Sequence, residues 1–104
     1  MRIPDRIKIG CNEFTVEWRD ELDAAGNIGL SSVSLNKIYM ARRTKDSVGG
    51  VVVEMPEPVL VDTFLHEVLH SLSCLYGLKL KERQIEGLAG GLMQVIRDNA
   101  LDFR

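Results

Sequence analysis

The stretch from Val59 to Tyr76 constrains the fold of this chain of 104 residues more than any other segment. Its apolar residues recur at helical spacing but occupy more than one face, so we expect a helix in the interior of the structure. Pro58 fits the first turn of this helix, and Gly77 is well placed to end it in a left-handed conformation. The apolar residues are Val59, Leu60, Phe64, Leu65, Val68, Leu69, Leu72 and Leu75.

The same stretch carries both histidines of the chain, His66 and His70, with Glu67 directly after the first. This arrangement is an H-E-x-x-H motif. Residues four apart lie on one face of a helix, so both imidazoles can reach one metal ion while Glu67 projects beside it. The alternative is a pair of buried core histidines that bind no metal. A helical conformation of this segment would favour the metal site.

Two imidazoles do not complete a catalytic zinc site, which takes three protein ligands and a water molecule. The chain has no third histidine, so the third ligand must be a carboxylate or a cysteine. Glu82 and Glu86 share one face of a second predicted helix, and Cys74 lies one turn beyond His70. We favour Glu86, one turn deeper in its helix, over Glu82, which stands where glutamate often complements the helix dipole. Cys74 is the third choice.

The two halves of the chain predict different structure. Short β-branched and aromatic runs between turn residues predict strands in the first half, and the second half predicts two helices. We therefore expect an α+β fold in one domain, residues 1–104, with a small antiparallel sheet of three to five strands packed on two helices. The first helix carries the histidines and the second carries the third ligand. The remaining expected segments are a hairpin of residues 7–9 and 14–18, a turn at 23–27, an antiparallel pair at 28–35 and 37–42 around Asn36, a loop at 44–50, an extended segment at 51–54 and the second helix at about 81–99.

Three glycines, Gly87, Gly90 and Gly91, fall inside the second predicted helix, where each costs ~1 kcal/mol relative to alanine. We expect a packing reason, namely a close approach of the first helix to this surface. A weak or kinked helix is the alternative.

Composition and charge exclude two classes of partner. The net charge is −2, so no surplus of positive charge is present to replace the counterions of a nucleic acid. No apolar stretch approaches the length that spans a bilayer, and the first ten residues lack the apolar segment of a secretion signal. We expect a cytoplasmic protein without a membrane partner, in which Cys11 and Cys74 are reduced thiols.

The motif at residues 66–70 and the segment Gln84-Ile85-Glu86-Gly87-Leu88-Ala89 together resemble a gluzincin metallopeptidase. The chain is most similar to the small single-domain minigluzincins, and more loosely similar to metallopeptidases that cleave phage immunity repressors. The resemblance covers residues 29–99. It implies Zn²⁺ held by His66, His70 and Glu86, with Glu67 as the general base that hydrolyses a peptide or protein substrate. It also implies a phage or prophage protein.

One position departs from the gluzincin pattern. Many gluzincins carry an acidic residue one turn after the ligand glutamate, and with Glu86 as the ligand that position holds Gly90. Another group must then orient the ligand histidines, because a ligating imidazole usually donates its free N–H to a partner. Asp62, one turn before His66, is one candidate, and Asn99 or a backbone carbonyl is another. Asp62 could equally be a favourable charge in the first turns of the helix.

Other residues suit roles in binding or in transition-state stabilisation. Tyr39 and Tyr76 could donate to a developing oxyanion, although a structural ring with a solvated hydroxyl is the simpler interpretation of each. Trp18 is interpreted as a core or interface residue. A substrate of such folds commonly pairs with an exposed sheet edge, for which we expect residues 37–41 or 51–54.

Two other classes of function compete with the peptidase. A non-catalytic zinc-binding domain would have a closed site with four protein ligands. The same alternative includes a latent peptidase, whose cleft is covered by dimerisation or by a terminal segment. A homodimer is compatible with both the peptidase and the non-catalytic domain. A helix-turn-helix DNA-binding domain with Gly77 in the turn is disfavoured, because the second helix has acidic residues and glycines where base-reading side chains are expected.

Overall fold

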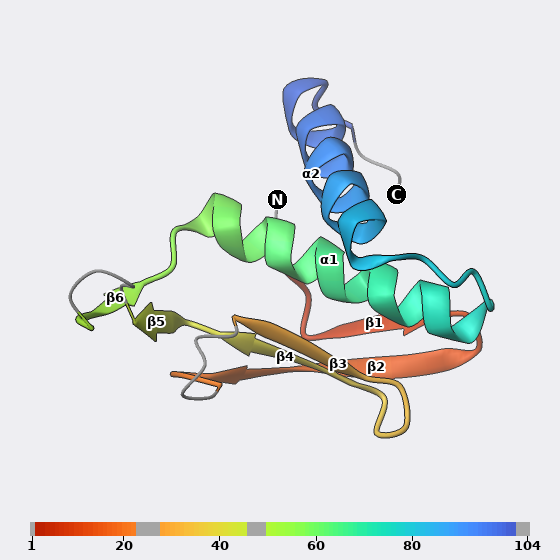
Figure 1. The fold of residues 1–104 in the computed structure, drawn as a ribbon, viewed down its shortest axis with the longest axis horizontal. Helices are drawn as coiled ribbons and strands as arrows, with labels where there is room; N and C mark the ends of the chain where they lie inside the picture. The colour runs from red at the N-terminus through yellow and green to blue at the C-terminus, as the bar shows by residue number, and fades with distance from the viewer. Residues whose placement is uncertain (1, 23–27, 46–49, 102–104) are drawn as a thin grey trace.

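The computed structural model describes residues 2–22, 28–45 and 50–101, and it confirms the α+β fold class. Figure 1 shows three layers, in which α1 lies between a sheet and α2. The predicted turn at 23–27 lies outside the described residues. The elements of the described chain are β1 (Arg6–Ile9), β2 (Asn12–Arg19), β3 (Gly29–Ser32), β4 (Lys37–Ala41), β5 (Arg43–Lys45), β6 (Val52–Glu54), α1 (Glu57–Leu75) and α2 (Glu82–Asp98).

Strands β1 to β4 form one sheet in the order β1-β2-β4-β3. Both predicted antiparallel pairs are confirmed, since β1 pairs with β2 and β3 pairs with β4. The prediction of an entirely antiparallel sheet is wrong at its centre, where β2 and β4 are parallel, with Val16 opposite Ile38. Each of these strands is the second arm of its hairpin and carries most of the buried sheet residues. In the sheet these two strands lie side by side in the centre and run in the same direction. Their hairpin partners, β1 and β3, therefore lie at the two edges.

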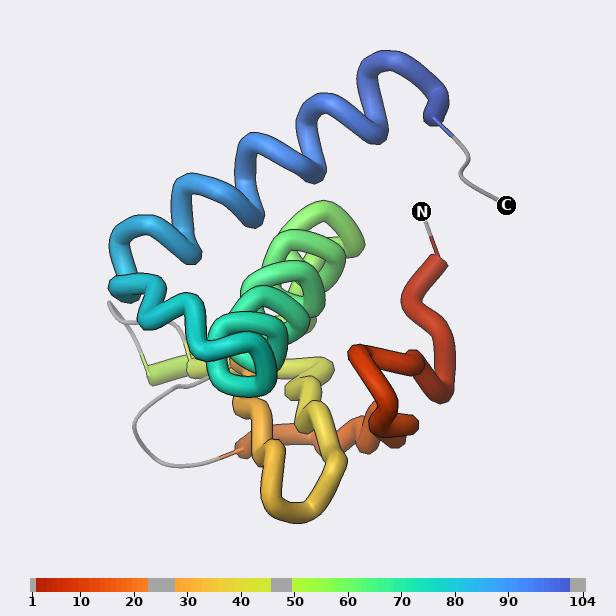
Figure 2. Tube along the Cα trace, turned by 90° about the vertical axis from the view of Figure 1, so that its right-hand side faces the viewer, coloured from red at the N-terminus to blue at the C-terminus, as the bar shows by residue number. Residues whose placement is uncertain are grey.

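The core lies between this sheet and α1. Phe14, Ile38 and Met40 are inaccessible to solvent, and Phe64 of α1 belongs to the same cluster. Figure 2 shows the other side of α1 covered by α2. The apolar residues on several faces of the first helix thus correctly predicted an interior position.

Both helices begin and end within two residues of their predicted bounds. Pro58 lies in the first turn of α1, and Gly77 follows its end with a φ of 65°, as expected. The Ser73 hydroxyl accepts a hydrogen bond from the Leu80 N–H at 2.9 Å. This bond ties the connection to the end of α1, so that α2 begins close to the first helix.

Two of the three glycines of α2 do not lie at its contact with α1. A Cβ atom at Gly87 or Gly91 would meet nothing within 4 Å, and one at Gly90 would lie 3.9 Å from Asp62 Oδ1, an ordinary van der Waals distance. The buried residues of α2 are Ile85 and Ala89. The prediction of a close helix approach is wrong for Gly87 and Gly91, which lie away from the side of α2 that is buried. Gly90 does face Asp62 of α1, but at an ordinary contact distance.

Strands β5 and β6 form a separate antiparallel pair. The extended segment predicted at 51–54 becomes β6, and residues 44 and 45 of the predicted loop belong to β5. Residues 46–49 of that loop lie outside the described residues. In the part of the chain that the structure describes, neither helix has the length and apolar character needed to cross a membrane.

Candidate metal centre

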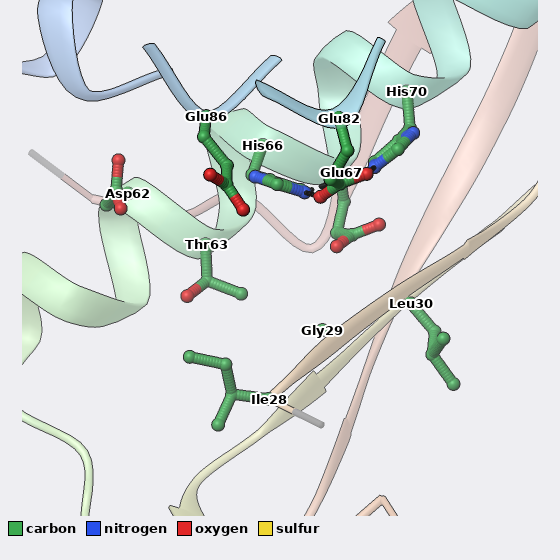
Figure 3. Close-up of a pocket in the computed structure, with 10 residues that line it drawn as sticks. All are labelled: Ile28, Gly29, Leu30, Asp62, Thr63, His66, Glu67, His70, Glu82 and Glu86. Atoms are coloured by element: carbon green, nitrogen blue, oxygen red, sulfur yellow. Dashed lines mark hydrogen bonds and ion pairs between the residues drawn. The ribbon is translucent and has the colours of Figure 1, made fainter. Parts of the chain in front are cut away.

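Three side chains from the two helices converge on one point. The Nε2 atoms of His66 and His70 lie 3.1 Å apart. The Glu82 carboxylate faces both rings, with Oε1 2.6 Å from His66 Nε2 and Oε2 2.9 Å from His70 Nε2. Figure 3 shows the rings and the carboxylate pointing toward one another. These three side chains could hold a metal ion.

While Glu82 is ionised, no placement of protons on the two Nε2 atoms makes all three contacts favourable. Each Nε2 atom has either one proton or one lone pair to direct at its neighbours. If both Nε2 atoms are protonated, the two N–H groups face each other; if one is not, its lone pair faces a carboxylate oxygen. A cation among the three groups would turn every lone pair toward positive charge. The donor set therefore has the chemistry of a metal site.

Helix geometry explains both halves of this cluster. The histidines share a face of α1 because they are four residues apart, and their ring centroids are 4.8 Å apart. Glu82 is the first residue of α2, which begins as the Lys81 N–H donates to Gln84 Oε1 at 2.8 Å. The carboxylate that joins the histidines is thus Glu82, the second choice of the sequence analysis. Glu86 lies outside the group of three but lines the same cavity.

Glu67 is buried beside the histidines, with 7 % of its surface exposed. Burial raises the pKa of its carboxyl above the usual value, while the neighbouring histidines and a hydrogen bond with the Ser31 side chain act in the opposite direction. The Ser71 hydroxyl, also buried, donates to the Glu67 carbonyl at 3.1 Å. Glu67 is therefore a buried carboxyl of raised proton affinity next to the group that could hold a metal ion.

Strand β3 approaches α1 very closely at Gly29. A Cβ atom there would lie 2.6 Å from Thr63 Cγ2 and 3.1 Å from both Cγ and Oε2 of Glu67. Sequence reasoning missed Gly29 and Ser31 as site residues. A glycine at the start of a strand is a signal of close backbone approach, but nothing in the sequence marks Ser31.

A cavity of about 590 Å³ opens over the cluster. It lies between the motif face of α1, the start of α2 and the edge strand β3 (Figure 3). The lining residues are Ile28, Gly29, Leu30, Asp62, Thr63, His66, Glu67, His70, Glu82 and Glu86.

The residues predicted to orient the histidines do not make those contacts. Asp62 lines the cavity, but its Oδ1 atom is buried without a hydrogen-bond partner among the described residues. Asn99 instead donates to the Val95 carbonyl at 3.0 Å, at the end of α2.

The aromatic residues and Cys74 also lie outside the centre. Tyr39 packs under the Arg19 guanidinium, and Tyr76 is 60 % exposed next to Gly10. Trp18 packs against the core, as expected. Cys74 is exposed and is not a member of the group of three.

Comparison of the chain with protein-family models, curated proteins and solved structures gives no match.

The close approach at Gly29 predicts a strong effect of one methyl group. Gly29→Ala is expected to lower the free energy of unfolding by about 1–3 kcal/mol, because its Cβ overlaps Thr63 Cγ2. Gly87→Ala is the matched control, and it should be neutral or stabilising by up to ~1 kcal/mol, since its Cβ enters open space in a helix. Denaturant titration measures both. Adding Thr63→Ser should recover part of the Gly29→Ala loss, and equal losses at the two glycines would contradict the packing.

The raised pKa of Glu67 predicts a pH-dependent cost. A carboxyl whose pKa is higher in the folded state loses stability as pH rises from its unfolded value, 4.5, through the folded value. In chelator-treated protein, Glu67→Gln should therefore be more stable than the wild type at pH 7. Denaturant titration should show this gain shrinking as the pH falls through the folded pKa toward 4.5, and little of it should remain below that pH. The exposed Glu21→Gln serves as control, and an equal gain there would contradict the assignment.

Proposed function

We propose that the protein is a zinc-dependent metallopeptidase in which His66, His70 and Glu82 hold the metal and Glu67 is the general base. The observation that carries this proposal is the convergence of two imidazoles and one carboxylate, with Glu67 buried beside them at a cavity. Two histidines and one glutamate are the ligand set of a known class of catalytic zinc site. The gluzincin resemblance of the sequence supports the same conclusion.

Zinc suits the donor atoms and their spacing. Ligand atoms about 2.0–2.2 Å from a tetrahedral zinc ion lie about 3.3 Å from one another. The contacts of 2.6, 2.9 and 3.1 Å are close enough to that value for small side-chain movements to accommodate the ion. Imidazole and carboxylate ligands are also typical of zinc.

Glu82 as the third ligand removes the departure from the gluzincin pattern. With Glu82 as the ligand, the residue one turn later is Glu86, which is acidic as in the gluzincin pattern. With Glu86 as the ligand, the residue one turn later would be Gly90. Glu86 lines the cavity next to His66 in Figure 3, where an acidic residue is expected to help orient the ligands.

Bound zinc would supply a water molecule of lowered pKa and would polarise a peptide carbonyl. Glu67 would take the proton of that water and deliver it to the departing amine. Its burial favours this role, because a carboxylate of raised pKa accepts a proton more readily near neutral pH. The Ser31 side chain holds this carboxyl from the sheet side.

Strand β3 is the proposed docking edge for an extended peptide. It is the sheet edge that lines the cavity, and Leu30 on it is 44 % exposed. The expectation for residues 37–41 is wrong, because β4 lies between β2 and β3 and has no free edge. Residues 51–54 do not line the cavity. The partner proposed from this geometry is a peptide or protein strand.

A zinc-binding domain without catalytic activity is the second candidate. One observation favours it: none of the described residues that line the cavity is a tyrosine, lysine or arginine that could stabilise an oxyanion. Against it, the described group offers three protein ligands, whereas structural zinc sites have four.

The ligand assignment predicts unequal effects of two similar substitutions. Glu82→Gln should lower zinc affinity about 100-fold or more, because a ligand is lost, and Glu86→Gln about 10-fold, because only an orienting group is lost. Competition with a chromophoric zinc chelator measures both. A larger loss in Glu86→Gln would return the third ligand to Glu86.

The general-base assignment predicts that binding and turnover separate. Glu67→Gln should keep zinc affinity within a few-fold of the wild type but reduce hydrolysis of casein or a peptide library at least about 100-fold. Turnover that is unchanged in this variant would refute the assigned base. A wild type that binds zinc but cleaves no peptide would favour the non-catalytic candidate.

A further inference from the structure

Helix α2 is attached to the rest of the described chain along one side. Among the described elements, α1 is the only one that α2 contacts extensively, and Figures 1 and 2 show α2 on the far side of α1 from the sheet. Of its 17 residues, Ile85 and Ala89 are buried and Gly90, Met93 and Ile96 are half-buried, whereas the others are exposed. A helix with so few buried apolar contacts belongs to the part of a protein that opens most readily by local unfolding.

The contact between the two helices also contains two unfavourable features. Asp62 Oδ1 is buried without a hydrogen-bond partner among the described residues, and it lies 3.9 Å from the position that a Cβ atom at Gly90 would take. Docking of α2 therefore removes a carboxyl oxygen from water without replacing its hydrogen bonds. Farther along, a cavity of about 120 Å³ lies between Met93 and Arg97 of α2 and the first turns of α1, so the packing there is incomplete.

Glu82 is the residue through which a metal ion would link the two helices. It is the first residue of α2, and its carboxylate oxygens lie 2.6 Å and 2.9 Å from the Nε2 atoms of His66 and His70 on α1. Without a cation at least one contact within this group is unfavourable, so the group adds little to docking. With a cation bound, the same three side chains join α1 to α2 through one centre.

We propose that binding of Zn²⁺ is coupled to docking of α2 on α1. Ligation by His66, His70 and Glu82 stabilises the docked helix, and in metal-free protein α2 detaches transiently by local unfolding while α1 and the sheet stay folded. This inference rests on the metal ligands of the proposed function but not on its catalytic activity. Because Glu82 and Glu86 line the cavity from α2, the supply of metal controls whether the cavity and its centre are complete (Figure 3).

Amide hydrogen exchange of the full chain, with and without Zn²⁺, tests this coupling. In chelator-treated protein the amides of α2 should exchange at least about 10-fold faster than those of β2 and β4, because detachment leaves the sheet intact. Free Zn²⁺ at about 100 times its dissociation constant should slow the α2 amides about 30- to 100-fold, since the detached state keeps only two histidine ligands and binds the ion far more weakly. Competition with a chromophoric chelator supplies the dissociation constant.

Two substitutions of the same chemistry on α2 separate this coupling from metal binding itself. With Zn²⁺ at about 100 times the dissociation constant of the variant, Glu82→Gln should slow the α2 amides less than about threefold, because His66 and His70 then hold the ion on α1 alone. Glu86→Gln, treated in the same way, is the matched control and should keep most of the slowing. The reverse pattern would overturn Glu82 as the link between the helices.

Asp62→Asn tests the cost of docking in the chelator-treated protein. Removal of a buried charge should slow exchange of the α2 amides about 10-fold, whereas Asp20→Asn at an exposed position should leave them unchanged.

Two results would overturn the coupling. One is metal-free protein in which α2 amides exchange as slowly as those of β4, and the other is tight Zn²⁺ binding that does not slow them. Either result leaves the proposed peptidase standing, and a protein that shows the coupling but cleaves no peptide leaves this inference standing. A chain that binds no Zn²⁺ would overturn both.

Discussion

The site depends on four hydrogen-bonding atoms from three side chains, held so close together that protons cannot satisfy every contact. His66, His70 and Glu82 meet at 2.6, 2.9 and 3.1 Å, and with the carboxylate ionised at least one of these contacts is unfavourable without a cation. Holding the groups there requires two helices with a fixed relation to each other. The bond from Leu80 to Ser73 and the packing of Ile85 and Ala89 on the inner side of α2 provide that relation.

Strand β3 connects the stability of the fold with the proposed chemistry. Gly29 allows α1 to lie against the strand, and Ser31 holds the buried Glu67 carboxyl. Among the described strands, only β4 pairs with this strand, so its other edge carries no neighbour there. One strand can therefore position the proposed base and receive an extended substrate. Burying Glu67 costs stability, a cost often found where a side chain is arranged for function rather than for folding.

Helix α2 divides its roles between two sides. The inner side packs on α1 and carries Glu82, while a Cβ atom at Gly87 or Gly91 would meet nothing within 4 Å. Each helical glycine costs ~1 kcal/mol relative to alanine, and contact with α1 does not account for Gly87 or Gly91.

The sequence by itself determined the features that depend on local periodicity: the bounds of α1 and α2, the two hairpins, and the placing of His66 and His70 on one helical face. Only the tertiary structure decided which carboxylate meets them. Glu82 and Glu86 share a face of α2, and the choice between them depends on where the connection starts that helix against α1. Strand order was equally hidden, because alternation shows which side of a strand is buried but not which strand lies beside it. The edge position of β3, and with it the roles of Gly29 and Ser31, follows from packing the two most buried strands side by side in the centre.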